Sequence, residues 1–219
     1  MSLSAFSLAG PAHDCPLCPR LAEFRSTNRA AFPDWFNAPV PPFLPSATDE
    51  PVKLLIVGLA PGLRGANRTG RPFTGDYAGD LLYDTLCRFG LAEGRYAADP
   101  GDGLQLRGCM IANAVRCVPP QNKPTGPEIN NCRPFLTELI GALPDLRAIL
   151  ALGTVAHGSV LSALGQRKSA WKFGHGALHE LPDGPVLADS YHCSRYNTNT
   201  GRLTEPMFHA VFQSLGEIL

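Results

Sequence analysis

Four of the seven cysteines in this 219-residue chain are spaced so that they could hold a metal centre together. Cys15 and Cys18 form a Cys-Pro-Leu-Cys pair, and Cys117 and Cys132 flank a proline-rich stretch. Four thiolates suit either a tetrahedral zinc ion or a 4Fe–4S cluster, and spacing alone does not separate the two. Plain burial of Cys117 and Cys132 as small apolar side chains is an equally good interpretation. A metal centre here would be structural, because it would join the N-terminal segment to a later loop.

The run GLAPGLRGANRTGRPFTGD at residues 58–76 directly follows the apolar stretch VKLLIV. It contains five glycines and three arginines, Arg64, Arg68 and Arg71. Glycine lets backbone amides come close to a phosphate, and the arginines add positive charge. The run therefore predicts a strand-end loop suited to a polyanion, although each arginine could equally be an ordinary solvated side chain. It lacks the GxGxxG spacing of dinucleotide-binding loops.

Apolar runs alternate with helical patterns along the chain, and this alternation predicts which elements position these residues. The expected strands are Val52–Val57, Cys109–Val115, Leu146–Leu152 and Val186–Tyr191, and the expected helices are Tyr77–Phe89, Glu128–Leu143, 153–164 and Glu205–Leu219. Continuous short apolar runs are typical of buried parallel strands. We expect an α/β fold of one domain, a three-layer α/β/α arrangement around a central, mostly parallel four-stranded sheet. Ligands bind beyond the carboxyl ends of such strands, which selects segments 58–76, 113–120, 153–157 and 192–202.

Composition narrows the class of protein. The formal net charge is zero, so any site for nucleic acid must be local rather than global. No apolar run is long enough to span a membrane, and the first residues lack the pattern of a secretory signal. A cytoplasmic protein is expected, and its odd number of cysteines argues against a disulfide framework.

Taken together, these motifs resemble the uracil-DNA glycosylases of the iron–sulfur branch, most closely their B type, or family five. The matching segments are GLAPGLRGANRTGRPFTGD, NAVRCVPPQNKPT, the four cysteines and HCSRYNTNTGRLT, in the family's order and across nearly the whole chain. One departure is His192-Cys193-Ser194, where the family usually has His-Pro-Ser. The resemblance implies a structural 4Fe–4S cluster held by Cys15, Cys18, Cys117 and Cys132 and no catalytic metal. It also implies a monomeric DNA repair enzyme that flips uracil out of DNA and hydrolyses its N-glycosidic bond.

The resemblance also assigns roles to single residues. Asn113 would recognise uracil through its carboxamide and Phe73 would stack on the flipped base. Asp76 would position or activate water, and His192 would donate to the uracil O2 as negative charge develops there. Each has a structural alternative: a turn or cap for Asn113, core packing for Phe73, a helix N-cap for Asp76 and a satisfied buried histidine for His192. Gly58, Ala60 and Asn197 complete the expected substrate pocket.

DNA contacts are expected from both basic segments. The residues expected to contact DNA are Arg64, Arg68, Arg71, Ser194, Arg195 and Arg202. Either Arg195 or Tyr196 could fill the gap left by the flipped base. Two other functions are compatible with parts of the sequence: a non-catalytic iron–sulfur module that binds DNA, and a zinc-stabilised nucleotide hydrolase. The hydrolase is the weaker of these, because the expected site offers only Asp76 where magnesium would require several carboxylates.

Overall fold

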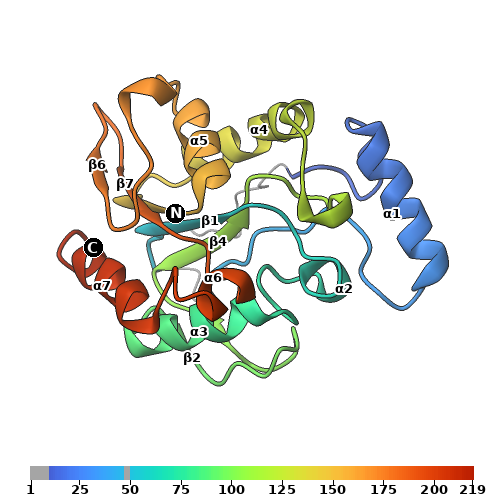
Figure 1. The fold of residues 1–219 in the computed structure, drawn as a ribbon, viewed down its shortest axis with the longest axis horizontal. Coiled ribbons are helices and arrows are strands. Elements are labelled where there is room, and N and C mark those ends of the chain that lie inside the picture. Colours follow the sequence, from blue (N-terminus) through green and yellow to red (C-terminus); the bar gives the residue numbers. More distant parts are fainter. Residues whose placement is uncertain (1–9, 47–49) are drawn as a thin grey trace.

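The computed structural model describes residues 10–46 and 50–219, and its centre is a five-stranded sheet in the order β4-β1-β5-β7-β6 (Figure 1). Four strands are parallel: β1 (Leu54–Gly58), β4 (Cys109–Asn113), β5 (Ala148–Leu152) and β7 (Val186–Ser190). Every residue of β1, β4 and β5 is buried. This explains their continuous apolar sequences, since a parallel strand in an α/β protein is covered on both faces.

The fifth strand, β6 (Leu178–Glu180), was not expected from the sequence. It pairs antiparallel with β7 at the edge of the sheet. Its three residues, Leu-His-Glu, are too few and too polar to form an apolar run, and two of them are exposed. A separate two-stranded ladder, formed by β2 (Ala92–Glu93) and β3 (Gln105–Leu106), was missed for the same reason.

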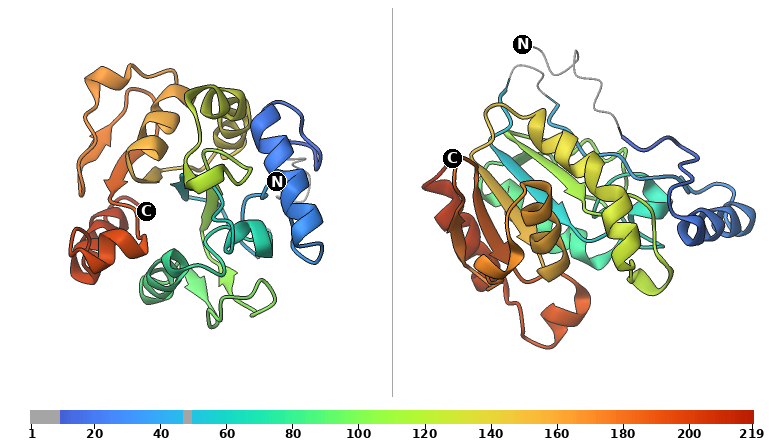
Figure 2. Two further views of the ribbon diagram at one scale, coloured as in Figure 1. Left: turned by 45° about the vertical axis from the view of Figure 1, so that its right-hand side comes forward. Right: turned by 90° about the horizontal axis from the view of Figure 1, so that it is seen from above.

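Helices cover both faces of the sheet, which confirms the three-layer α/β/α arrangement (Figure 2). On one face, α3 (Tyr77–Arg88) and α7 (Glu205–Gly216) pack against alternate strand residues such as Leu54 and Ile56. On the other, α4 (Gly126–Gly141) and α5 (Thr154–Ala163) pack against the intervening residues, including Leu55 and Val57. The sheet is therefore the central layer between two apolar cores.

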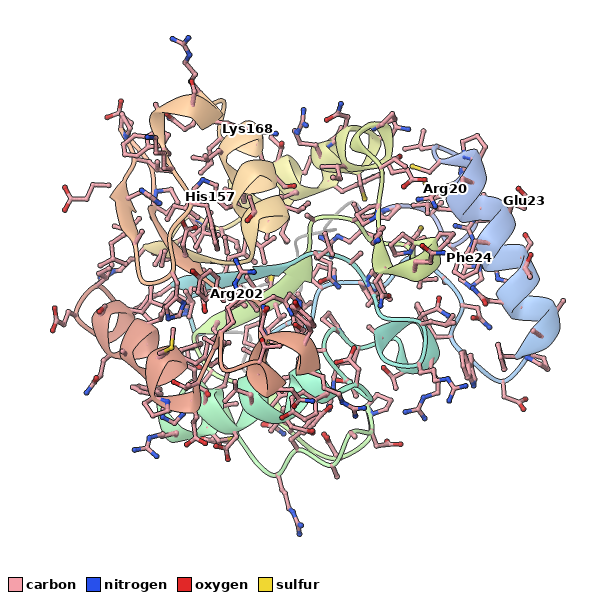
Figure 3. The ribbon with its side chains drawn as sticks, in the orientation of Figure 1. Arg20, Glu23, Phe24, His157, Lys168 and Arg202 are labelled. Atoms are coloured by element: carbon pink, nitrogen blue, oxygen red, sulfur yellow. The ribbon has the colours of Figure 1, made fainter. Side chains whose placement is uncertain are left out.

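The N-terminal helix α1 (Pro19–Ala31) lies outside these layers, next to the loops that leave β4 (Figure 1). Leu21 packs against Val115 and Cys132 in a small third cluster. Arg20 forms an ion pair with Glu128 at 2.7 Å, which joins α1 to the start of α4 (Figure 3). No helix in the described part of the chain is both long and apolar enough to cross a membrane.

Parallel strands bring their carboxyl ends to one edge of the sheet. Gly58, the last residue of β1, pairs in register with Asn113, the last residue of β4. The segments after β5 and β7 begin at the same edge, where Gly153 N–H donates to the carbonyl of Ser190 at 2.8 Å. The four shorter helical segments are α2 (Ala66–Thr69), α6 (Arg195–Asn199) and the 3-10 turns at Pro120–Asn122 and Lys168–Ala170. Of these, α2, α6 and the turn at Pro120–Asn122 belong to loops that leave this edge.

Candidate active site

A cleft of about 800 Å³ opens at this edge of the sheet. All four strand-end segments selected from the sequence contribute to it. The residues that line this cleft include Ala60, Gly62, Arg64, Gly65, Phe73, Asp76, Tyr77, Asn113, Asn122, His192, Ser194 and Arg195. The four residues expected to handle the base and the glycosidic bond, Phe73, Asp76, Asn113 and His192, thus share one cavity.

Gly58 makes room for two of these side chains. A Cβ atom at Gly58 would lie 2.6 Å from Cζ of Phe73 and would also collide with Oδ1 of Asn113. Phe73 is 6% exposed and Asn113 is 3% exposed, so both are held in the floor of the cleft with one side open to it. An aromatic ring next to a carboxamide can stack on a planar base and hydrogen-bond to its edge.

His192 stacks with the Phe73 ring. The Phe73 and His192 ring centroids are 5.6 Å apart with an interplanar angle of 27°. Burial lowers the pKa of His192 to about 4, and its Nδ1 is buried without a hydrogen-bond partner among the described residues. The imidazole is therefore neutral at physiological pH. Asn197 donates from Nδ2 to the His192 carbonyl at 2.8 Å, so it orients the loop that carries the histidine.

Asp76 combines its expected catalytic position with its structural alternative. It is the N-cap of α3, where its Oδ1 accepts from the Ala78 amide at 3.2 Å. Its other oxygen, Oδ2, occupies the space that a Cβ atom would need at Gly62 or Gly65. Burial raises the pKa of the carboxyl group above 3.8. Asp76 can therefore cap the helix with one oxygen and offer the other to a water molecule, as a carboxylate with two oxygens allows.

Three glycines of the 58–76 run make room for side chains of the site. Gly58 accommodates Phe73 and Asn113, while Gly62 and Gly65 accommodate Asp76. Larger residues at these positions would push the side chains of the site out of place. The glycines explain how a loop can wrap closely around three functional side chains.

Most of the expected DNA-contacting residues lie at or near the cleft and are open to solvent. Arg64 and Arg195 are exposed and line it, and the Arg195 guanidinium lies 5.2 Å from the Tyr77 ring centroid. Arg68 is exposed on α2, and Arg202 is exposed with its guanidinium 4.6 Å from the ring centroid of Tyr191 (Figure 3). Ser194 lines the cleft and caps α6.

The structure corrects the expectation for Arg71. This arginine is 6% exposed and makes a bidentate ion pair with Asp102, at 2.8 and 2.7 Å. Its guanidinium also lies 5.1 Å from the Phe43 ring centroid. A side chain that is buried and paired in this way does not contact DNA. The sequence could not show this, because Asp102 comes from a loop 31 residues further along the chain.

Sequence reasoning missed Asn122. It lies in the 3-10 turn at Pro120–Asn122, is exposed and lines the cleft opposite the 58–76 loop. Gln121 and Asn122 both have φ of 56°, a left-handed conformation that asparagine tolerates better than most residues. The available signal was an asparagine in the proline-rich loop after β4, close to a segment already selected as part of the site.

The four cysteines expected to bind a cluster line one separate cavity next to α1, together with Arg25. Three of their sulfurs already receive hydrogen bonds. Arg116 N–H donates to Cys132 at 3.3 Å, Arg25 Nη1 to Cys117 at 3.5 Å and Asn131 Nδ2 to Cys18 at 3.7 Å. Burial raises the pKa of Cys117 to about 12, so without a metal its thiol would be neutral.

Two buried arginines beside this cavity have no acidic partner among the described residues, although Arg25 Nη2 donates to the Cys15 carbonyl at 3.0 Å. Arg25 is 4% exposed and its Nε has no hydrogen-bond acceptor among the described residues. Arg116 is 3% exposed, its Nη1 is likewise unpartnered within the described chain, and burial lowers its pKa to about 10. Buried charges normally come with a counter-charge, so these arginines indicate a negatively charged group in or beside the cavity.

A third cluster, formed by His157, His179 and Asp189, has ligand atoms within 4.8 Å of one another. His157 Nδ1 lies 2.8 Å from Asp189 Oδ1, and its Nε2 lies 3.0 Å from the Trp171 carbonyl. Because both neighbours are acceptors, both ring nitrogens carry protons and none is left to bind a metal. Burial alone would lower the pKa of His157, but the hydrogen bond and charge of Asp189 outweigh it and raise the pKa above 6.5. The cluster is a buried ion pair that ties α5 to β7.

Comparisons with known proteins agree with this geometry. Residues 45–216 match the family model described as "Uracil DNA glycosylase superfamily". The chain is 46% identical over 200 residues to the type-5 uracil-DNA glycosylase of Thermus thermophilus, with 89% of each chain covered. It is 40% identical over 195 residues to the type-5 enzyme of Pyrobaculum aerophilum, with 87% of this chain and 83% of the relative covered. The type-4 enzyme of the same organism matches over 125 residues at 34% identity.

Proposed function

The chain belongs to the uracil-DNA glycosylase superfamily, in its type-5 branch, and we propose that it removes uracil from DNA by hydrolysing the bond between base and deoxyribose. The observation that carries this proposal is the convergence of Phe73, Asp76, Asn113 and His192 on one cleft. The shared cleft and the enzymatic names of the relatives both favour catalysis over a non-catalytic DNA-binding module. Other deaminated or damaged bases are further candidate substrates.

Base recognition follows from Phe73 and Asn113. A uracil flipped into the cleft presents its O4 acceptor next to its N3–H donor. The Asn113 carboxamide can donate to O4 and accept from N3–H, whereas cytosine presents the opposite polarity. Phe73 would stack on one face of the base, and such stacking contributes about 1–3 kcal/mol. Gly58 and Ala60 border this position without filling it.

Bond cleavage follows from His192 and Asp76. As the N-glycosidic bond breaks, its electron pair stays with the base and negative charge develops on the uracil O2. The neutral His192 can donate a hydrogen bond from Nε2 to that oxygen, which is electrostatic stabilisation of the leaving group. A water molecule attacks the electron-poor sugar carbon, and Asp76 accepts a proton from that water. The raised pKa of Asp76 makes it a better proton acceptor than an exposed aspartate.

The exposed arginines at the rim, Arg64, Arg68, Arg195 and Arg202, would bind the DNA backbone, with Ser194 as a further phosphate contact. Of the two candidates for the residue that fills the vacated place in the duplex, we favour Tyr196. Its side chain is 72% exposed, whereas Arg195 already lies over the Tyr77 ring. Because one chain supplies all these residues, we propose that the enzyme acts as a monomer. We also propose a cytoplasmic location, in keeping with its expected role in DNA repair.

The cysteine cavity suits the 4Fe–4S cluster that the family resemblance implies. Cys15, Cys18, Cys117 and Cys132 would hold it, and it would cross-link α1 to the loop after β4. Four thiolates suit a tetrahedral zinc ion as well as a 4Fe–4S cluster, and the family resemblance is the reason for proposing the cluster. Four thiolates would also give it a net negative charge, which Arg25 and Arg116 would balance.

Release of free base from oligonucleotides tests the proposed function. Duplexes with one uracil opposite each normal base, and a single strand with one uracil, should give free uracil and an alkali-labile abasic site. Matched oligonucleotides with cytosine or thymine at that position serve as controls. Tight binding of the uracil oligonucleotides without base release would instead establish the non-catalytic alternative. Hypoxanthine and xanthine in the same positions would define the range of substrates.

A further inference from the structure

Phe73 has a backbone conformation that bulky residues rarely adopt. Its φ is 53°, in the left-handed region that favours glycine. Such strain persists only where surrounding contacts hold it, and it gathers at functional sites. In this protein the strained residue is the aromatic ring proposed to stack on the base, which raises the question of what holds it in place.

The backbone on both sides of Phe73 is held by buried hydroxyl groups. The Tyr96 hydroxyl donates to the Phe73 carbonyl at 3.2 Å and accepts from the Gly75 amide at 3.1 Å. The Pro72 carbonyl accepts from the hydroxyls of Tyr83 and Thr74. Residues 72–75 are thus fixed by side chains rather than by a helix or strand.

Arg71 and Asp102 hold those groups in turn. Arg71 Nε donates to the Thr74 hydroxyl at 2.7 Å, and its two other nitrogens bind the Asp102 carboxylate. Asp102 also accepts from the amides of Ala97 at 2.9 Å and Leu104 at 3.0 Å, which closes the β2–β3 loop that carries Tyr96. The Asp102 side chain is 1% exposed, so water does not compete for these bonds.

We propose that Arg71, Asp102 and Tyr96 are positioning residues that hold Phe73 in its left-handed conformation and so place the ring against the flipped base. This inference rests on the proposed function and deepens it. The β2–β3 loop does not line the cleft, yet it determines the aromatic wall of the cleft through one ion pair and one hydroxyl. Without this clamp, Phe73 can relax toward the common negative φ values and carry its ring away from the base.

Tyr96→Phe is the most conservative test of the clamp. It removes one hydroxyl and preserves the ring, which stacks on Tyr83 at 4.7 Å. Under single-turnover conditions with saturating enzyme, uracil release should fall by about tenfold, because two hydrogen bonds to the strained segment are lost. Affinity for undamaged duplex should not change. Glu93→Gln is the matched control, because it breaks the exposed Arg107–Glu93 ion pair on the same hairpin and should leave the rate unchanged.

A double-mutant cycle separates positioning from general stability. If Tyr96 acts through Phe73, the double variant Phe73→Ala/Tyr96→Phe should release uracil less than twofold more slowly than Phe73→Ala alone. An unchanged rate in Tyr96→Phe, or a full tenfold further loss in the Phe73→Ala background, would overturn the proposal. Arg71→Lys preserves the charge but loses the bidentate geometry, and it should show the same dependence on Phe73.

The clamp can also be tested apart from activity. If the wild-type protein releases no uracil, the proposed function has failed, and hydrogen exchange of the Gly75 amide then decides the clamp. Exchange should be faster in Tyr96→Phe than in Glu93→Gln, since only the first loses the acceptor of that amide. Equal exchange in both variants would refute the clamp.

Discussion

Replacing Asp76 separates its two roles, because asparagine and alanine remove different parts of the side chain. Asp76 caps α3 through the Ala78 amide at 3.2 Å and offers its second oxygen to the cleft. Asp76→Asn preserves the shape and an oxygen that can still cap the helix, but it removes the proton acceptor. Asp76→Ala removes both. The proposed mechanism therefore predicts that the two variants lose activity alike and differ in stability.

The expected magnitudes follow from the site. Loss of a general base lowers the rate about 10²–10⁴-fold in either variant. Loss of an N-cap costs about 1 kcal/mol, which in a chain of this size should place the Tm of Asp76→Ala about 2–4 °C below that of Asp76→Asn. Burial raises the folded pKa of Asp76 above 3.8, so the ionised form destabilises the fold at neutral pH. Asp76→Asn should therefore match or exceed the wild-type Tm at pH 7, and that gain should vanish as the pH falls below both pKa values.

The assay measures single-turnover uracil release, duplex affinity and thermal unfolding for both variants. Duplex affinity should stay within about twofold of wild type, because no rim arginine pairs with Asp76 among the described residues. A rate loss of less than about tenfold in Asp76→Asn would refute the assignment of Asp76 as the base. Equal loss of Tm in both variants would show that the carboxylate serves mainly the fold.

Three further predictions concern the other parts of the site. Asn113→Asp removes the donor for the uracil O4 and should lower uracil release by about tenfold or more. The comparison variant is Asn113→Ala, which lacks the repulsion between a carboxylate and O4. An unchanged preference for uracil would refute Asn113 as the recognition residue. The rate should be level near pH 6.5 and fall in acid as Asp76, whose pKa is raised by burial, takes up a proton. The pKa of His192 is about 4, so a pH–rate profile with a break near 6.5 would contradict a neutral His192. Anaerobically purified protein should be brown and contain iron, with Cys132→Ser losing both colour and stability, whereas colourless protein with stoichiometric zinc would refute the cluster.

The sequence alone determined the layers of the fold and the edge of the sheet where the site lies. Continuous apolar runs identify buried parallel strands, and parallel strands necessarily gather their carboxyl ends at one edge. The sequence therefore predicted a shared site for four residues, since each follows or ends one of those strands: Phe73, Asp76, Asn113 and His192. Strand β6 could not be found in this way, because a three-residue edge strand has too few residues for a period and exposes polar side chains.

Only the tertiary structure decided what each residue in the 58–76 loop does. Arg64 and Arg71 are the same residue type in the same basic run. Arg64 is exposed at the cleft, whereas Arg71 is buried and paired with Asp102. The sequence predicted glycines that let the backbone approach a phosphate, and it could not show that Gly58, Gly62 and Gly65 also accommodate Phe73, Asp76 and Asn113. Local sequence encodes periodicity and backbone preference, which are properties of neighbours along the chain. Burial and pairing depend on residues that folding brings from distant segments, so the strain at Phe73 and the loop that holds it became visible only in three dimensions.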